Sequence, residues 1–102
     1  MKTEEIRNLF NLFEAASGEF EGVECWSARE LQTLLGYSKW ENFEKVISKA
    51  EDACNNAGEN TQNHFPDVRK MVTIGSGAEK EIADILLTRY ACYLVAQNGD
   101  SR

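Results

Sequence analysis

The stretch that decides the predicted fold is CWSARELQTLLGYSKWENFEKVISKA, residues 25–50. Two capping boxes of the form Ser-x-x-Glu begin at Ser27 and Ser38. Each box is followed by apolar residues at helical spacing, and Gly36 between them stands where glycine commonly ends a helix. The stretch therefore predicts two helices joined by a tight turn, with the second helix starting at Lys39.

Helical patterns continue on both sides of this stretch. Residues 3–16 place a stripe of apolar side chains on one face of a helix, and these are Ile6, Leu9, Phe10 and Phe13. Leu12 widens that face, so the helix either packs on its own domain, which we expect, or docks on another chain. Residues 55–63 are polar and predict a loop, and residues 65–72 fit a further short helix. Thr88 caps a final helix over residues 89–98, which is apolar nearly all round and therefore expected to be central.

Three short segments have strand character, namely residues 23–26, 72–74 and 85–87. We expect the last two to pair as a hairpin around the glycine-rich residues 75–80, with the first segment extending the sheet. Four to five helices and a small two- or three-stranded antiparallel sheet predict a helix-rich α+β domain. A chain of 102 residues forms one domain, which we divide into an N-terminal helix over 1–20 and a core over 21–102.

The charge balance limits the partners. The chain has 11 Lys and Arg residues against 17 Asp and Glu residues, a formal net charge of −6. Seven of the acids and three of the bases fall in residues 1–30. An acidic surface is a poor partner for duplex DNA and for anionic lipid. No apolar run approaches the roughly 20 residues of a membrane span, and the charged N-terminal residues do not suit a signal peptide. The sequence therefore predicts a cytoplasmic domain with no membrane partner.

Candidate catalytic and metal-binding residues are few. The cysteines Cys25, Cys54 and Cys92 are widely spaced, and His64 is the only histidine. A structural zinc site needs four clustered ligands, and cysteine catalysis needs a thiol paired with a base. We expect the cysteines to be small buried hydrophobic residues. Residues 75–80 lack the spacing of a phosphate-binding loop. We therefore predict no metal, no cofactor, no small-molecule substrate and no enzymatic activity.

The two central helices have the proportions of a helix-turn-helix motif. The candidate contact residues for nucleic acid or a partner are Lys39, Asn42, Lys45 and Lys49 on the second helix, and Arg69, Lys70 and Arg89 near the predicted hairpin. Asn pairs with adenine and Lys with guanine or phosphate, whereas Glu41 and Glu44 among them would repel phosphate. Two capped helices are also a common packing motif, so both interpretations stay open. Trp40, on the apolar stripe, is expected in the core rather than as a stacking platform for bases.

Several motifs between Glu24 and Arg102 resemble one family of bacterial proteins. These are ECWSARELQ (24–32), LGYSKW (35–40), NF (42–43) and, most specifically, LTRYACYLV (87–95) with QNGD (97–100). The family is that of the bacterial DNA-damage-inducible D proteins. The chain is more distantly similar to the Bro-N domains of phage antirepressors and viral proteins, which share the opening of strand, short helix, Gly-Tyr and helix.

The resemblance implies a Bro-N-like fold and a function that spacing alone does not give. Proteins of this family are induced in the bacterial SOS response, are non-enzymatic, and act on RecA recombinase filaments, where they oppose strand exchange. They are longer than this chain, so the resemblance implies that it is the N-terminal part of such a protein. The alternative is a DNA-binding domain of the Bro-N antirepressor type. The family supplies no catalytic residues, and residues 1–20 match it poorly.

Overall fold

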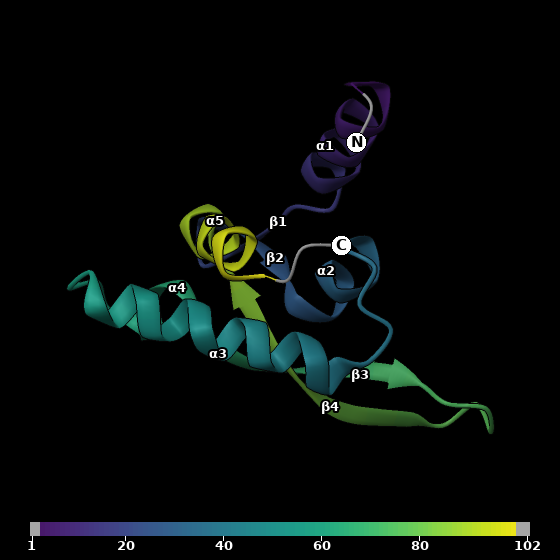
Figure 1. Ribbon diagram of the computed structural model, residues 1–102. Helices are drawn as coiled ribbons and strands as arrows, with labels where there is room; N and C mark the ends of the chain where they lie inside the picture. Colours follow the sequence, from purple (N-terminus) through teal and green to yellow (C-terminus); the bar gives the residue numbers. More distant parts are fainter. Residues whose placement is uncertain (1–2, 100–102) are drawn as a thin grey trace.

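The computed structural model describes residues 3–99. Its helices are α1 (Thr3–Ala15), α2 (Ala28–Leu34), α3 (Trp40–Asn56), α4 (Thr61–His64) and α5 (Arg89–Asn98). Its strands are β1 (Gly18–Phe20), β2 (Val23–Ser27), β3 (Asp67–Thr73) and β4 (Glu79–Leu87). Figure 1 shows α3 and α5 beside one another, with the long β3–β4 hairpin extending past the N-terminal end of α3. The predicted α+β class is confirmed. The ends of the predicted domain, residues 1–2 and 100–102, lie outside the described residues.

The sheet has four antiparallel strands in the order β1-β2-β4-β3, so the expectation of two or three strands is wrong. The additional strand is β1, which lies in the segment that the sequence analysis assigned to an N-terminal helix. It pairs with β2 across a two-residue turn in which both Glu21 (φ 51°) and Gly22 (φ 80°) have positive φ. Turns with two positive φ angles match the twist of paired strands. The Gly at the second position adopts its positive φ without steric cost.

The hairpin of β3 and β4 confirms that two such strands pair, but the predicted register, residues 72–74 against 85–87, is wrong. Val72 lies opposite Lys80, and Asp67 lies opposite Ile85. The helix predicted over residues 65–72 is therefore wrong. In the strand, Val68, Lys70 and Val72 are half-buried on one face, while the residues between them, including the apolar Met71, are exposed. β-Branched side chains and a full-length partner strand favour the extended form.

The core lies where α2 and α5 pack against β2 and β4, with α3 packed on α5 and α2. The apolar stripe predicted for the second helix is confirmed, since Phe43, Val46, Ile47, Ala50 and Cys54 of α3 are buried. Trp26 of β2 is 1% exposed and is the largest fully buried side chain. By contrast, α1 buries no residue completely and projects from the body of the domain (Figure 1).

The connection between α2 and α3 fixes the relation of these helices. Gly36 has a φ of 82°, and the N–H groups of Gly36 and Tyr37 donate to the carbonyls of Thr33 and Gln32. This is the glycine-terminated helix end that the sequence predicted. The Ser27 cap is also confirmed, because its hydroxyl accepts from the N–H of Glu30. The predicted cap at Ser38 is wrong: α3 begins one residue later, after Lys39, which makes no side-chain cap.

Candidate functional site

An apolar groove lies between α1, α2 and α5. It encloses a volume of about 490 Å³. Its lining residues are Ile6, Leu9, Phe10 and Phe13 of α1, Leu31, Leu34 and the adjoining Leu35 of α2, and Arg89, Cys92, Tyr93, Val95 and Ala96 of α5. Phe10 is 58% exposed and Tyr93 is 62% exposed. Exposed aromatic side chains gathered around an apolar hollow are typical of a binding surface. The stripe predicted on the first helix thus packs on its own domain only in part.

The last turn of α1 attaches to the sheet through Phe13 and Trp26. The two rings stack with centroids 4.3 Å apart and nearly parallel planes. The indole Nε1 of Trp26 donates a 2.7 Å hydrogen bond to the backbone oxygen of Phe13, which gives the buried indole N–H the partner it needs. One end of α1 is therefore held in place, while the earlier turns present Ile6 and Phe10 to the groove.

Arg89, at the start of α5, holds two carboxylates together. Its guanidinium donates to both carboxylate oxygens of Glu14 and to both of Glu24, at 2.8 to 3.1 Å. The same guanidinium lies 5.1 Å from the Trp26 ring centroid. The hydrogen bonds from Arg89 lower the pKa of Glu14 below its ordinary value, and the two carboxylates raise the pKa of Arg89. Arg89 is thus a clasp between α1, β2 and α5.

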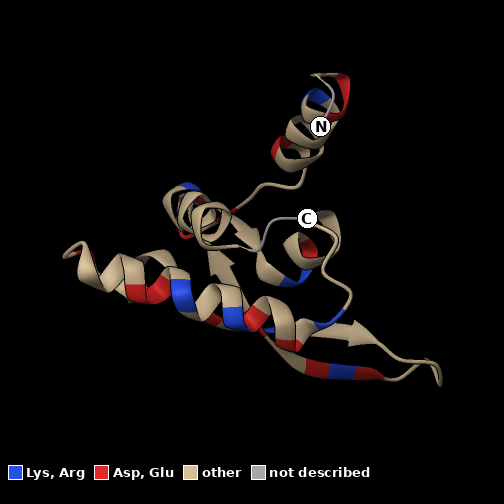
Figure 2. Ribbon diagram, viewed as in Figure 1, with Lys and Arg blue, Asp and Glu red and all other residues tan. Residues whose placement is uncertain are grey.

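The candidate residues on α3 form a stripe that is only partly basic. Asn42, Lys45 and Lys49 are exposed and recur at i, i+3 and i+7, so they share one side of the helix. Glu41 and Glu44 are exposed next to them, and Figure 2 shows acidic and basic positions mixed along α3. Lys39 is exposed just before the helix. Within residues 3–99, no carboxylate lies at salt-bridge distance from Lys39, Lys45 or Lys49.

The second predicted basic group does not assemble. Arg69 and Lys70 are neighbours on β3 and therefore point to opposite faces of the hairpin. Arg69 lies 3.9 Å from Glu81, and Lys70 lies 3.8 Å from Glu30. Arg89 is engaged with Glu14 and Glu24. Each of the three bases thus has an acidic neighbour, and Arg69 and Lys70 do not share a face.

Two features beside α2 were not predicted from the sequence. The guanidinium of Arg29 lies 3.9 Å from the ring centroid of Trp40 and donates to the carbonyl of Ala83. Trp40 is half-buried beneath it, so the expectation of a core Trp40 is only partly correct. Asp84, 2% exposed, accepts hydrogen bonds from Ser27, from the N–H of Arg29 and from its neighbour's N–H. Only the fold reveals the links of Asp84 to Ser27 and Arg29, because these partners are more than fifty residues away in the sequence.

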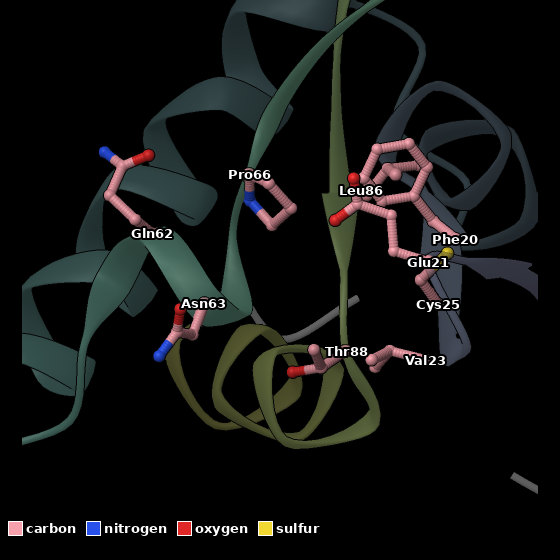
Figure 3. Close-up of a pocket in the computed structure, with 9 residues that line it drawn as sticks. All are labelled: Phe20, Glu21, Val23, Cys25, Gln62, Asn63, Pro66, Leu86 and Thr88. Atoms are coloured by element: carbon pink, nitrogen blue, oxygen red, sulfur yellow. The ribbon is translucent and has the colours of Figure 1, made fainter.

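A second hollow of about 270 Å³ lies between the β1–β2 turn, α4 and the end of β4. Figure 3 shows its lining, which includes Cys25, Gln62 and Asn63. Burial raises the pKa of the Cys25 thiol. The ring of His64 contacts Thr88, with Nδ1 2.8 Å from the hydroxyl oxygen. Burial also raises the pKa of Cys92 to about 12. These thiols are protonated at neutral pH and are poor nucleophiles.

Two absences concern residues 3–99, the part of the chain that the structure describes. In that part of the chain, no cluster of three or more His, Cys, Asp or Glu side chains is arranged to hold a metal ion. No helix there is both long and apolar enough to cross a membrane.

Comparison with known proteins places the sequence in a family. Residues 19–102, which run from β1 past α5, match the family model of the BRO family, N-terminal domain. The chain belongs to the Bro-N family. The predicted resemblance is therefore confirmed. In this Bro-N chain, the match includes the α2–α3 pair, the β3–β4 hairpin and α5, but leaves α1 outside.

This Bro-N chain is also similar to DNA damage-inducible protein D of Escherichia coli (strain K12). The identity is 52% over 79 residues, which cover 78% of this chain and 29% of the relative. The chain thus spans less than a third of the relative that it matches. No solved structure gives a significant match.

Proposed function

We propose that this domain is a non-enzymatic regulator in the bacterial DNA-damage response, acting in the cytoplasm. In this proposal it engages filaments of the RecA recombinase on DNA and opposes strand exchange. The identity of 52% to a DNA damage-inducible protein supports the cellular context. That relative is more than three times as long as the matched region, and the proposal extends its role to this domain.

The observation that carries the proposal is the distribution of charge and apolar surface. The bases Arg69, Lys70 and Arg89 each lie beside a carboxylate, and acidic residues interrupt the bases on α3 (Figure 2). A protein that binds by neutralising phosphates needs uncompensated bases on one face. The groove between α1, α2 and α5 exposes apolar and aromatic side chains instead. This balance favours contact with a protein over contact with a bare duplex.

A strand-exchange assay tests the proposal. RecA filaments are formed on circular single-stranded DNA, linear duplex is added, and the yield of exchanged product is measured with and without the 102-residue chain. We expect the product to decrease with increasing chain and the chain to co-sediment with the filaments. Unchanged exchange, with no co-sedimentation at a molar excess of the chain, would reject the proposal.

A second candidate function is DNA binding of the Bro-N antirepressor type. One observation favours it: Asn42, Lys45 and Lys49 share one side of α3, the second helix of a helix-turn-helix pair. Reversing Lys45 and Lys49 to Glu then abolishes duplex binding without unfolding the domain, because both side chains are exposed. Electrophoretic mobility shift measures duplex binding by the double variant. Circular dichroism checks that the variant is folded. Binding that survives the double reversal would exclude α3 as the contact.

A further inference from the structure

β3 is an edge strand with an open outer side. It is the last strand in the order β1-β2-β4-β3, and it packs chiefly against β4. Figure 1 shows the hairpin of these two strands extending past the N-terminal end of α3. The opposite edge of the sheet, β1, has only three residues, whereas β3 has seven. A long edge strand presents a row of backbone groups with which another strand can pair.

Two hydrogen bonds determine which backbone groups of β3 face outward. The N–H of Ile74 donates to the carbonyl of Ala78. The N–H of Leu86 donates to the carbonyl of Pro66. Hydrogen-bonded residues alternate along an antiparallel pair, and the register of β3 with β4 is continuous between these two bonds. The even-numbered residues of β3 therefore bond to β4. The odd-numbered residues point their N–H and C=O groups away from it, and these are Asp67, Arg69, Met71 and Thr73.

The outward-facing groups are accessible to another strand. All four residues are exposed, and within residues 3–99 no backbone hydrogen bond reaches their N–H and C=O groups. Proteins protect sheet edges with bulges, prolines and unpaired charges. β3 has no proline, and its register with β4 advances without a bulge. Its two bases, Arg69 and Lys70, each lie beside a carboxylate. Met71, at the middle of the outward row, is 55% exposed.

A second copy of β3 fits this edge in one register. When two β3 strands pair antiparallel about Met71, outward-facing groups of both copies meet, and Arg69 lies opposite Thr73. Like charges directly opposite one another destabilise a sheet. A two-fold register centred on Lys70 or on Arg69 places that base opposite itself, whereas the register about Met71 places no like charges opposite. A register centred on Val72 overlaps only the end of the two strands.

The same register also brings complementary side chains together. Thr73 pairs with Glu79 within the hairpin, so Arg69 of one copy and Glu79 of the other share a row, with only Thr73 between them. Symmetry repeats this row of opposite charges. On the other face, Val68 of one copy lies opposite Ile74 of the other, and Ile74 is 42% exposed in the single chain. Cross-strand apolar pairs of this kind stabilise a sheet.

We propose that two copies of this chain associate through antiparallel pairing of their β3 edges about Met71, which joins the two four-stranded sheets into one. The contact adds a strand pair without burying a helix face, so the interface is small and the dimer is weak. This inference goes beyond the proposed function, because it needs neither recombinase nor DNA. Dimerisation with no effect on strand exchange would leave it intact. Inhibition of strand exchange by a monomer would instead leave only the proposed function intact.

Sedimentation equilibrium of the chain, from about 10 µM to about 1 mM, measures the association. Met71→Pro removes an outward-facing N–H but no bond to β4, and proline is tolerated at such edge positions. Because Met71 faces itself, the substitution removes both hydrogen bonds of the central pair, and we expect the dissociation constant to rise about tenfold or more. Met71→Thr is the matched control, because it keeps the N–H, and should change the constant by less than about threefold. A chain that stays monomeric, or a dimer that Met71→Pro does not weaken, would overturn the proposal.

Amide hydrogen exchange tests the same pairing in the unmodified chain, so the test does not depend on how the proline variant folds. The N–H groups of Lys70 and Val72 bond to β4, and their exchange should be slow at every concentration. Those of Arg69, Met71 and Thr73 face outward, and we expect their exchange to be slower at about 1 mM than at about 50 µM. Exchange at these three residues that is equally fast at both concentrations would contradict pairing of the β3 edges.

Discussion

At the residue scale, Asp84 links parts of the chain that the sequence keeps far apart. Its carboxylate accepts from the hydroxyl of Ser27, from the N–H of Arg29 and from the N–H of Ile85. These donors belong to the start of α2 and to β4, so one side chain fixes the first turn of a helix on the sheet. Leaving a buried donor without an acceptor costs more free energy than a typical hydrogen bond contributes to stability.

Replacing Asp84 tests this role. Asp84→Ala leaves its buried donors without a protein acceptor, and we expect a loss of about 2 to 3 kcal/mol in the free energy of unfolding. Asp84→Asn retains one oxygen for the two N–H groups and should cost less than half as much. Ser27→Ala, which removes the helix cap, should cost about 1 kcal/mol. Urea denaturation measures the free energy of unfolding of all three variants. If Asp84→Ala is no less stable than Asp84→Asn, Asp84 does not fix the start of α2 on β4.

The clasp of Arg89 predicts a response to acid. Hydrogen bonds from Arg89 hold the pKa of Glu14 below its ordinary value of 4.5. A carboxyl whose pKa is lowered by folding contributes stability above its unfolded pKa, and loses it as the pH falls through the lower, folded pKa. The attachment of α1 should therefore persist through pH 4.5 and loosen only below it.

The indole N–H resonance of Trp26 reports this attachment, because that N–H donates to the backbone of Phe13. In an NMR titration, we expect its shift to change with a midpoint below pH 4.5. In Arg89→Gln the midpoint should move upward, since the hydrogen bonds that lower the Glu14 pKa are removed. A midpoint that is the same in both proteins would show that Arg89 does not hold Glu14.

At the element scale, glycines set where the helices end. Gly36 after α2 and Gly58 after α3 have φ angles of 82°, a region that costs other residues about 1 to 2 kcal/mol. Gly36→Ala should therefore lower stability by that amount. Gly75→Ala is the matched control, because Gly75 does not have positive φ and a Cβ there meets no atom within 4 Å. Thermal denaturation compares them, and equal effects would contradict the account of the α2–α3 turn.

Many of the helices and their ends are predictable from the sequence, and the wrong predictions have physical causes. The buried stripe of α3, the Ser27 and Thr88 caps and the stop at Gly36 are local features, and each is confirmed. The apolar spacing over residues 65–72 favours a helix, and only the pairing of β3 with β4 imposes the extended form. β1 was missed because it is three residues long and depends on the turn that follows it.

At the scale of the whole molecule, composition does not predict which side chains become neighbours in the candidate site. The net charge of −6 predicted weak affinity for DNA, but not that Arg69, Lys70 and Arg89 would each have an acidic neighbour. Those pairs join residues up to 75 positions apart, so no spacing rule reveals them. The apolar groove likewise depends on where α1 lies relative to α2 and α5.

We propose that the domain engages a recombinase filament through protein contacts rather than by reading bare DNA. The most direct measurement compares its affinity for RecA filaments on single-stranded DNA with that for the same strand and for duplex without RecA, at about 150 mM salt. We predict that it binds the filaments clearly, whereas its affinity for bare DNA is no better than non-specific, about 10⁻⁴ to 10⁻⁶ M. Nanomolar, sequence-selective duplex binding, with no preference for filaments, would contradict the account.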